Sequence, residues 1–277
     1  MIINLVNTEK SELPVKIIKF PDGQVIVDVD SSSVPCDFDG YFKIYSRGSW
    51  NDLQIVSGAV KAIRHLWSNE ILLYIPYIGG RSDRRFSENQ AHYLKEVYAP
   101  VLNSLNCYVY TLDPHSDVVD AVITNCCPYT NKNYVETVLK HSKTNDNCLV
   151  VPDNGALKKC HEILSLFSSF IVCDKTRDIS TGKISSINIP NLIPHADSYY
   201  IVDDICDGGR TFIEIGKLLR PRILTDLNLV VTHGIFSNGF TELLSIFSEI
   251  HSTNSFMDMP DEECVLEYDA FELIDNN

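Results

Sequence analysis

The sequence lacks the features that mark several common protein classes. It has no CxxC pair among its nine cysteines and no apolar window approaching the roughly 20 residues of a membrane-spanning helix. Its start, "MIINLVNTEK", has no basic segment followed by a long apolar run, as a signal peptide would. These absences argue against a cysteine zinc site of the usual spacing and against a membrane-spanning protein. They predict reduced thiols and a cytoplasmic location.

Positive charge is also scarce. Lysine and arginine number 23 against 37 aspartates and glutamates, which gives a formal net charge of −14. Binding to nucleic acid or to an anionic membrane needs a basic surface, so neither partner is expected. A small anionic substrate stays compatible with this charge, because a few local cations override a net negative field.

Short β-branched runs alternate with segments of helical spacing. This pattern predicts an α/β fold with mostly parallel sheets flanked by helices. "FPDG" is a turn sequence, so the first two strands should form a hairpin. The predicted strands cover 15–20, 24–29, 41–45, 71–76, 107–112, 148–152, 170–174, 199–203 and 228–232, and the predicted helices cover 52–67, 87–105, 154–165, 211–220 and 238–249.

The length of 277 residues suits two domains. A polar stretch near 130–146 follows the first set of elements, so we place the domains at 1–136 and 137–277. The tail after about residue 250 is acidic and has little periodicity. In open α/β sheets, ligands bind beyond the carboxyl ends of the strands. Four segments with suggestive residues follow predicted strands and are therefore the candidate ligand-binding segments: 76–85, 152–155, 174–177 and 203–211.

The stretch "VDDICDGGRT" (202–211) has the composition of a binding site. The adjacent carboxylates of Asp203 and Asp204 can accept hydrogen bonds from a vicinal diol or help to hold a hydrated Mg²⁺ ion. The two glycines let backbone N–H groups turn around an anion at a helix N-terminus, where Thr211 adds a hydroxyl. A ribose 5-phosphate group requires this combination. The alternative is a simple strand-end turn with Asp207 or Thr211 as helix N-cap.

This stretch resembles the phosphoribosyl-diphosphate (PRPP) binding signature of type I phosphoribosyltransferases and of ribose-phosphate diphosphokinases (PRPP synthetases). Other motifs, in the correct order between about 15 and 240, resemble the second family. They are "FPDGQ" (20–24) for F-S-D-G-E, "IPYIGGRSDRRF" (75–86) for Y-x-R-Q-D-R, "TLDPHSD" (111–117) for D-L-H, "VVPDNGALKK" (150–159) for V-V-S-P-D-x-G, "IVCDKTRD" (171–178) for I-I-D-K-R-R and "VTHGIFSNG" (231–239) for A-T-H-P-I-F-S-G.

The resemblance implies two phosphoribosyltransferase-like (type I) domains and a homo-oligomer, dimeric or hexameric. It implies a reaction in which the C1 hydroxyl of the ribose attacks the β-phosphorus of Mg-ATP, AMP leaves and a diphosphate group is transferred. No P-loop signature is present, so arginines, a histidine and Mg²⁺ would hold ATP. The implied residues are Lys175 and Arg177 for catalysis; Phe20, Asp22, Gln24, Arg81, Asp83, Arg84 and His115 for ATP; His115 and Asp153 for the metal; and Asp153, Asp203, Asp204, Asp207, Gly208, Gly209, Arg210 and Thr211 for the ribose phosphate.

The glycine-rich loop departs from the family pattern. The family usually has D-T-G-G-T, whereas this chain has "DGGRT", so Gly208 replaces a hydroxyl donor and Arg210 replaces a glycine. An arginine there can neutralise an additional phosphate, and a smaller residue at 208 can leave room for it. We therefore keep two acceptors open, ribose 5-phosphate and a larger 5′-substituted ribose such as ADP-ribose.

Two other functions remain open. A type I phosphoribosyltransferase would explain the segment 199–212 but leave 75–86, 111–117 and 231–239 unexplained. A non-catalytic regulatory homologue would be expected to lose the catalytic cations, and the presence of Lys175 and Arg177 counts against it.

Overall fold

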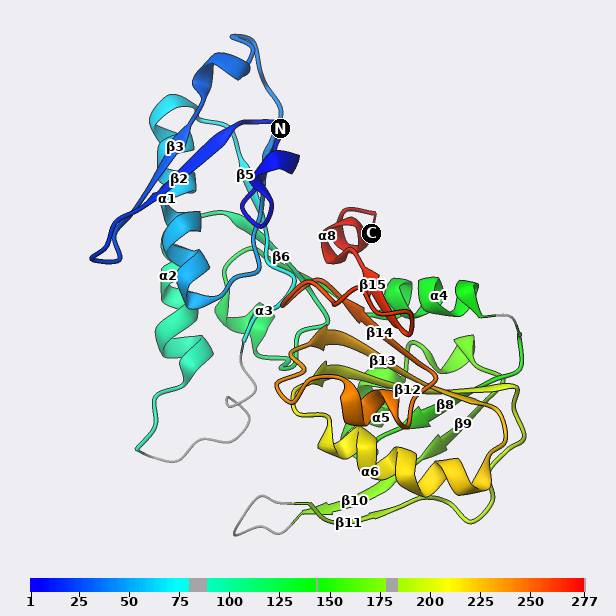
Figure 1. Ribbon diagram of the computed structural model, residues 1–277. Helices are drawn as coiled ribbons and strands as arrows, with labels where there is room; N and C mark the ends of the chain where they lie inside the picture. Colours follow the sequence, from blue (N-terminus) through cyan, green and yellow to red (C-terminus); the bar gives the residue numbers. More distant parts are fainter. Residues whose placement is uncertain (80–88, 143, 178–183, 277) are drawn as a thin grey trace. The chain divides into compact units, whose positions relative to one another are not determined.

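The structure is a computed structural model that describes residues 1–79, 89–142, 144–177 and 184–276. The chain forms two compact units. Unit 1 is Met1–Thr130 together with the end of the chain from Ala270, and unit 2 is Asn131–Asp269 (Figure 1). The boundary between the units therefore lies between residues 130 and 131. The predicted boundary between 136 and 137 would cut helix α4 (Lys132–His141) in two. The end of the chain returns to unit 1 because its last helix packs on that unit's sheet.

Unit 1 is built on a five-stranded parallel sheet with the strand order β1-β4-β5-β6-β7. A separate hairpin, β2–β3, is antiparallel and confirms the hairpin predicted from "FPDG". The elements of unit 1 are β1 (Ile2–Asn4), β2 (Val15–Lys19), β3 (Val25–Val29), β4 (Phe42–Tyr45), α1 (Trp50–Leu66), β5 (Ile71–Tyr74), the π-helical η3 (Tyr93–Tyr98), α2 (Ala99–Ser104), β6 (Tyr108–Leu112), α3 (Val119–Val122), β7 (Cys126–Tyr129) and α8 (Ala270–Asp275).

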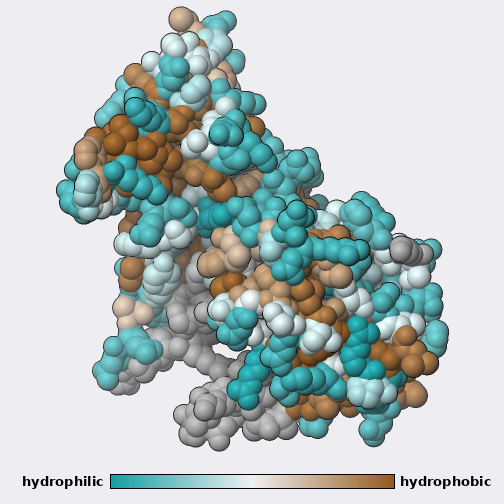
Figure 2. All heavy atoms as spheres, viewed as in Figure 1, coloured by the Kyte–Doolittle hydropathy of each residue, from teal (hydrophilic) through white to brown (hydrophobic). Residues whose placement is uncertain are grey.

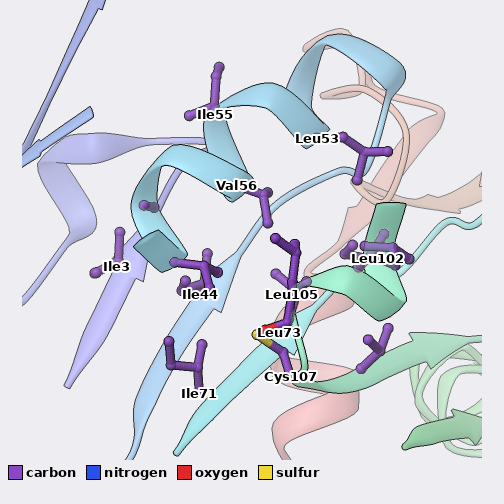
Figure 3. Packing of buried hydrophobic residues seen from close by; sticks show 14 of the residues in the cluster. Ile3, Ile44, Leu53, Ile55, Val56, Ile71, Leu73, Leu102, Leu105 and Cys107 are labelled. Atoms are coloured by element: carbon purple, nitrogen blue, oxygen red, sulfur yellow. Dashed lines mark hydrogen bonds between the residues drawn. The ribbon is translucent and has the colours of Figure 1, made fainter. Parts of the chain in front are cut away.

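Helix α1 covers one face of this sheet. It begins with a capping box, in which Ser49 and Asp52 each accept a hydrogen bond from the other's backbone N–H. Its buried side chains, Val56 among them, pack with Ile44 and Leu73 of the strands in one apolar layer (Figure 3). Burying such side chains stabilises the unit by about 1.5–3 kcal/mol each. In the view of Figure 2, hydrophilic residues cover much of the visible surface of both units.

Helix α8 packs against the tyrosines of the same sheet. Phe271 stacks on Tyr45 with ring centroids 5.0 Å apart. The Asp275 carboxylate accepts hydrogen bonds from Lys43 Nζ at 2.5 Å, Tyr74 Oη at 3.0 Å and Tyr45 Oη at 3.5 Å. Burial by itself would raise the pKa of Asp275, but the hydrogen bonds and the charge of Lys43 outweigh it and lower the pKa. The carboxylate of Asp275 therefore anchors the end of the chain.

We expect Asp275→Asn to lower the free energy of unfolding by about 1 kcal/mol at pH 7, because an ion pair at the surface is lost. A carboxyl group whose folded pKa is lowered stabilises the fold above its unfolded pKa of about 4 and loses that effect as the pH falls further. The difference between wild type and variant should therefore shrink below about pH 4. Urea unfolding at several pH values measures it, with Glu70→Gln as an exposed control in unit 1. A difference that does not change with pH would contradict the assignment.

Unit 2 is built on a six-stranded parallel sheet with the strand order β15-β14-β13-β12-β8-β9. A two-stranded antiparallel ribbon, β10–β11, follows β9 in the chain. The elements of unit 2 are α4 (Lys132–His141), β8 (Asn147–Val151), α5 (Asn154–Cys160), β9 (Ser169–Val172), β10 (Asp174–Arg177), β11 (Ile184–Asn188), β12 (Ser198–Cys206), α6 (Arg210–Leu219), β13 (Asp226–Gly234), α7 (Thr241–Leu244), β14 (Glu249–Thr253) and β15 (Val265–Tyr268).

Helix α6 and the segment that begins with α7 bury their apolar side chains against one face of this sheet. Phe212 and Ile215 of α6 share a cluster with Leu243 of α7 and with Ile201 and Leu229 of the central strands. Helix α4 packs in the same unit, and its Tyr134 donates a hydrogen bond to the carbonyl of Val231. The expected arrangement, parallel sheets flanked by helices, is confirmed.

The predictions were weakest near the end of the chain. The helix predicted over 238–249 is short, because α7 covers only Thr241–Leu244 and Glu249 already begins β14. The acidic tail, for which no element was predicted, contains β15 and α8 as well as most of β14. The side chains of His251 and Ser252 in β14 are buried although they are polar, so this strand has no apolar pattern that marks it in the sequence.

Candidate active site

The two adjacent aspartates lie within strand β12 rather than at its end. The strand was predicted to stop at Asp203, but it continues to Cys206, because Asp203 pairs with Val231 and Ile205 with His233 of β13. Neighbouring residues in a strand direct their side chains to opposite faces of the sheet. Asp203 and Asp204 therefore have different surroundings.

Asp204 is the more buried of the two, at 6% exposed. It forms an ion pair with Lys159, which lies in the last turn of α5. Asp203 is half-buried, and its Oδ1 accepts a hydrogen bond of 2.9 Å from the backbone N–H of Asp204. Asp203 is therefore the better placed of the two to meet a ligand, whereas Asp204 is engaged by Lys159.

The loop that follows β12 leads into helix α6. Gly209 is the N-cap and has a φ of +75°, a conformation that suits glycine. Among the described residues, no side chain caps this helix with a hydrogen bond. The alternative N-caps proposed from the sequence do not apply, because Thr211 lies inside α6 and Asp207 Oδ1 accepts a hydrogen bond of 2.7 Å from Ser237 Oγ. The N–H groups of the first turn, which have no partner within a helix, are thus available to an anion.

Arg210 is the first residue of α6 and is exposed. The space beside Gly208, however, is occupied. A Cβ atom placed at Gly208 would lie 2.7 Å from Nδ2 of Asn238. The idea that Gly208 leaves room for an additional phosphate therefore has no support from this contact, and the larger acceptor is favoured only by Arg210.

Asp153 lies at the same edge of the sheet. It follows β8, which pairs with β12, and it is the N-cap of α5, where its Oδ1 accepts a hydrogen bond of 2.9 Å from the backbone N–H of Ala156. Parallel strands end at one edge, so the loops after β8 and β12 lie near each other. The structure therefore brings Asp153 to the edge that carries Asp203 and the 207–211 loop.

The expected catalytic cations lie on strand β10. Lys175 pairs with Ile187 and Arg177 with Ile184 of β11, with a register shift between Thr176 and Arg177. The structure defines the backbone of β10 at these two residues. Because β10 follows β9, the outer neighbour of β8, the ribbon leaves the sheet at the edge where Asp153 lies.

The residues expected to bind ATP lie in unit 1. Phe20 is 42% exposed at the tip of the β2–β3 hairpin. Asp22 Oδ1 accepts a hydrogen bond of 3.1 Å from the backbone N–H of Gln24, so this carboxylate also shapes the turn. His115 lies in the loop between β6 and α3. Arg81, Asp83 and Arg84 lie outside the described residues.

Three residues near the site were not assigned a role from the sequence. Lys159 is 45 positions from Asp204, and nothing in the sequence links the two. Ser237 and Asn238 lie in the motif 231–239, but their contacts with Asp207 and Gly208 follow only from the pairing of β12 with β13.

Two absences apply to the part of the chain that the structure describes. No group of three or more histidine, cysteine, aspartate or glutamate residues there is arranged to hold a metal ion. No helix there is long and apolar enough to cross a membrane. All nine cysteines are free thiols in the structure.

Comparison with known proteins supports the predicted resemblance. The ribose-phosphate pyrophosphokinase of Ureaplasma parvum is 28% identical over 249 residues, which cover 86% of this chain and 72% of the relative. That of Methanopyrus kandleri is 26% identical over 253 residues, 87% of this chain and 84% of the relative. No family model matches the chain.

Among solved structures, phosphoribosylpyrophosphate synthetase from Mycobacterium smegmatis superposes with a TM-score of 0.75 at 18% identity, covering 95% of this chain and 89% of that one. The likeness confirms the predicted fold class, two phosphoribosyltransferase-like domains with mostly parallel sheets.

Proposed function

Starting from its homology to the ribose-phosphate pyrophosphokinases, we propose that this chain is a diphosphotransferase. It transfers the β,γ-diphosphate of Mg-ATP to the C1 hydroxyl of a ribose 5-phosphate group and releases AMP. The observation that carries the proposal is the N-terminus of α6, which no side chain caps among the described residues, beside Asp203 at the carboxyl edge of the unit 2 sheet. An anion cradle next to a half-buried carboxylate fits a sugar that carries both a phosphate and a diol.

The acceptor binds along this edge. The N–H groups at the start of α6 and the hydroxyl of Thr211 hold the 5′-phosphate, with Arg210 at the rim. Asp203 accepts hydrogen bonds from the ribose hydroxyls, and Asp204 supports the strand through Lys159. Holding the ribose at several points fixes the C1 hydroxyl relative to ATP, and such positioning lowers the barrier of a transfer reaction.

Lys175 and Arg177 stabilise the charge that develops on the phosphate oxygens during transfer. An in-line phosphoryl-type transfer needs little covalent chemistry from the protein, so catalysis consists mostly of positioning and charge stabilisation. On the ATP side, Phe20 stacks on adenine while Asp22 and Gln24 bond to its edge.

Mg²⁺ accompanies ATP in this proposal. Asp153 provides carboxylate oxygens, the ligands that Mg²⁺ prefers, whereas the nitrogen of His115 is a softer ligand. Mg²⁺ keeps several waters and binds through one or two carboxylates and the substrate phosphates, so Asp153 and the phosphates of ATP would together hold it. When bound, the ion would neutralise phosphate charge.

The acceptor is either ribose 5-phosphate, giving PRPP, or a larger 5′-substituted ribose such as ADP-ribose, giving its 1-diphosphate. The protein is incubated with Mg-ATP and each acceptor in turn, and chromatography measures the AMP that is released. At least one of the two acceptors should give AMP. Turnover with ribose 5-phosphate and none with ADP-ribose would reject the larger acceptor. Arg210→Gly should reduce use of ADP-ribose more than use of ribose 5-phosphate if the arginine meets a second phosphate.

The same assay separates the rival functions. A type I phosphoribosyltransferase would consume PRPP and release no AMP from ATP with any ribose acceptor. A regulatory homologue would bind nucleotide without turnover. Synthesis of PRPP or of its ADP-ribose analogue would give the protein a role in nucleotide or NAD metabolism. We also propose that the protein is cytoplasmic and forms a homo-oligomer, a dimer or a hexamer.

A further inference from the structure

A second loop supports the loop proposed to hold the phosphate of the acceptor, residues 207–211 of unit 2. This supporting loop, residues 235–239, follows β13, and its backbone N–H groups at Ile235 and Phe236 donate to the carbonyl of Cys206 at 2.8 and 3.1 Å. The cradle loop, residues 207–211, and the supporting loop therefore begin from a shared hydrogen-bonded base.

Two side chains of the supporting loop contact the cradle directly. Ser237 Oγ donates a hydrogen bond of 2.7 Å to Asp207 Oδ1, and the backbone N–H of Ser237 donates to the Asp207 carbonyl at 3.2 Å. Asn238 Nδ2 donates to the Gly208 carbonyl at 3.2 Å. Both Ser237 and Asn238 are exposed, so a bound acceptor can reach them.

Asn238 occupies the position that a side chain at 208 would need. A Cβ atom at Gly208 would lie 2.7 Å from Asn238 Nδ2 and 3.5 Å from its Cγ. The first distance is well inside ordinary van der Waals contact. A side chain at 208 would therefore displace the exposed carboxamide of Asn238 from its hydrogen bond to the Gly208 carbonyl.

The sequence departs from the family pattern at both of these positions. The patterns compared above have threonine where this chain has Gly208, and glycine where it has Asn238. The side chain missing from the cradle loop is matched by one gained in the supporting loop. An asparagine carboxamide carries two N–H donors, so one can bond to the Gly208 carbonyl while the other meets a phosphate oxygen.

We propose that Asn238 supplies the polar side chain of the cradle at position 208 from the neighbouring loop, and that it is a determinant of acceptor binding. The inference rests on the proposed function, because it assumes that the cradle holds the 5′ side of the acceptor. Ser237 acts as a positioning residue that orients Asp207.

A double-mutant cycle tests the proposal with Gly208→Thr, Asn238→Gly and the combination of both. Gly208→Thr should raise the KM for the acceptor about three- to tenfold, because threonine displaces the Asn238 carboxamide from its place beside the cradle loop. Asn238→Gly should raise it about three- to tenfold, the range for one lost hydrogen bond. The double variant should return to within about threefold of wild type, because threonine then has room and restores a donor.

The KM for ATP should also be measured for each variant. It should stay within about twofold of the wild-type value, because the cradle loop binds the acceptor and not ATP. Asn191→Gly, at an exposed asparagine of the same unit, is the control and should change neither constant. If the effects of Gly208→Thr and Asn238→Gly simply multiply, or if the KM for ATP changes equally, the inference is wrong while the proposed function stands.

Binding of ribose 5-phosphate and of ADP-ribose, measured by calorimetry without ATP, tests the role of Asn238 separately from the proposed reaction. A wild type that binds an acceptor but releases no AMP would reject the proposed reaction, and the same cycle in dissociation constants would then support or overturn the role of Asn238. A wild type that binds neither compound would overturn both.

Discussion

Replacing Lys175 and Arg177 together with alanine should lower kcat by about 10³–10⁵, the range found when a cation that stabilises phosphoryl transfer is lost. The two residues lie on β10, a strand whose backbone pairs with β11 outside the main sheet of unit 2. The fold should therefore tolerate the change. The KM for ATP should change much less than kcat, because the charge that these cations meet develops only in the transition state.

The measurement is AMP release under saturating ATP and acceptor, accompanied by circular dichroism to check the fold. Lys140→Ala/Lys217→Ala is the matched control, since it also removes two positive charges from unit 2, at exposed positions. Unchanged turnover in the Lys175→Ala/Arg177→Ala variant would reject the catalytic assignment. An equal loss in the control would show that net charge, rather than these residues, is responsible.

Replacing Lys159 with methionine should affect both stability and acceptor binding. Asp204 is 6% exposed and forms an ion pair with Lys159. Removing the lysine would leave the negative charge of this buried carboxylate without the positive charge of Lys159. Breaking a fully buried pair costs about 3–5 kcal/mol, and since the lysine side chain is 24% exposed we expect about 1–3 kcal/mol here. The KM for the acceptor should rise about tenfold or more, because the strand that carries Asp203 loses its support.

Lys159→Arg should retain most of the wild-type behaviour, since a guanidinium group can replace the ammonium group as partner of Asp204. Lys140→Met, which removes an exposed lysine from the last turn of α4, controls for the loss of one charge. Urea unfolding and steady-state kinetics with varied acceptor provide the two measurements. If Lys159→Met is no less stable than Lys140→Met and binds the acceptor normally, the pair with Asp204 has no positioning role.

The elements that could be predicted from the sequence are those whose signals lie within a few residues. The turn "FPDG" predicts the hairpin β2–β3, and the structure confirms it with Gly23 at a φ of +91°. The long amphipathic pattern after Ser49 predicts α1. The prediction for β14 failed because its buried residues include histidine, serine and threonine, whose burial depends on hydrogen bonds made elsewhere in unit 2, such as that from Thr253 Oγ1 to the Thr232 carbonyl.

By itself, the sequence determined the α/β class, the alternation of strands and helices, and the segments that carry Asp153, Lys175 and the "DGGRT" loop. The tertiary structure decided how those segments meet. Lys159 reaches Asp204, and Asn238 fills the space beside Gly208, because the strand order places β12 between β8 and β13. Turn and helix preferences act between near neighbours in the chain, whereas contacts across parallel strands depend on the order and register of the whole sheet, which its packing determines.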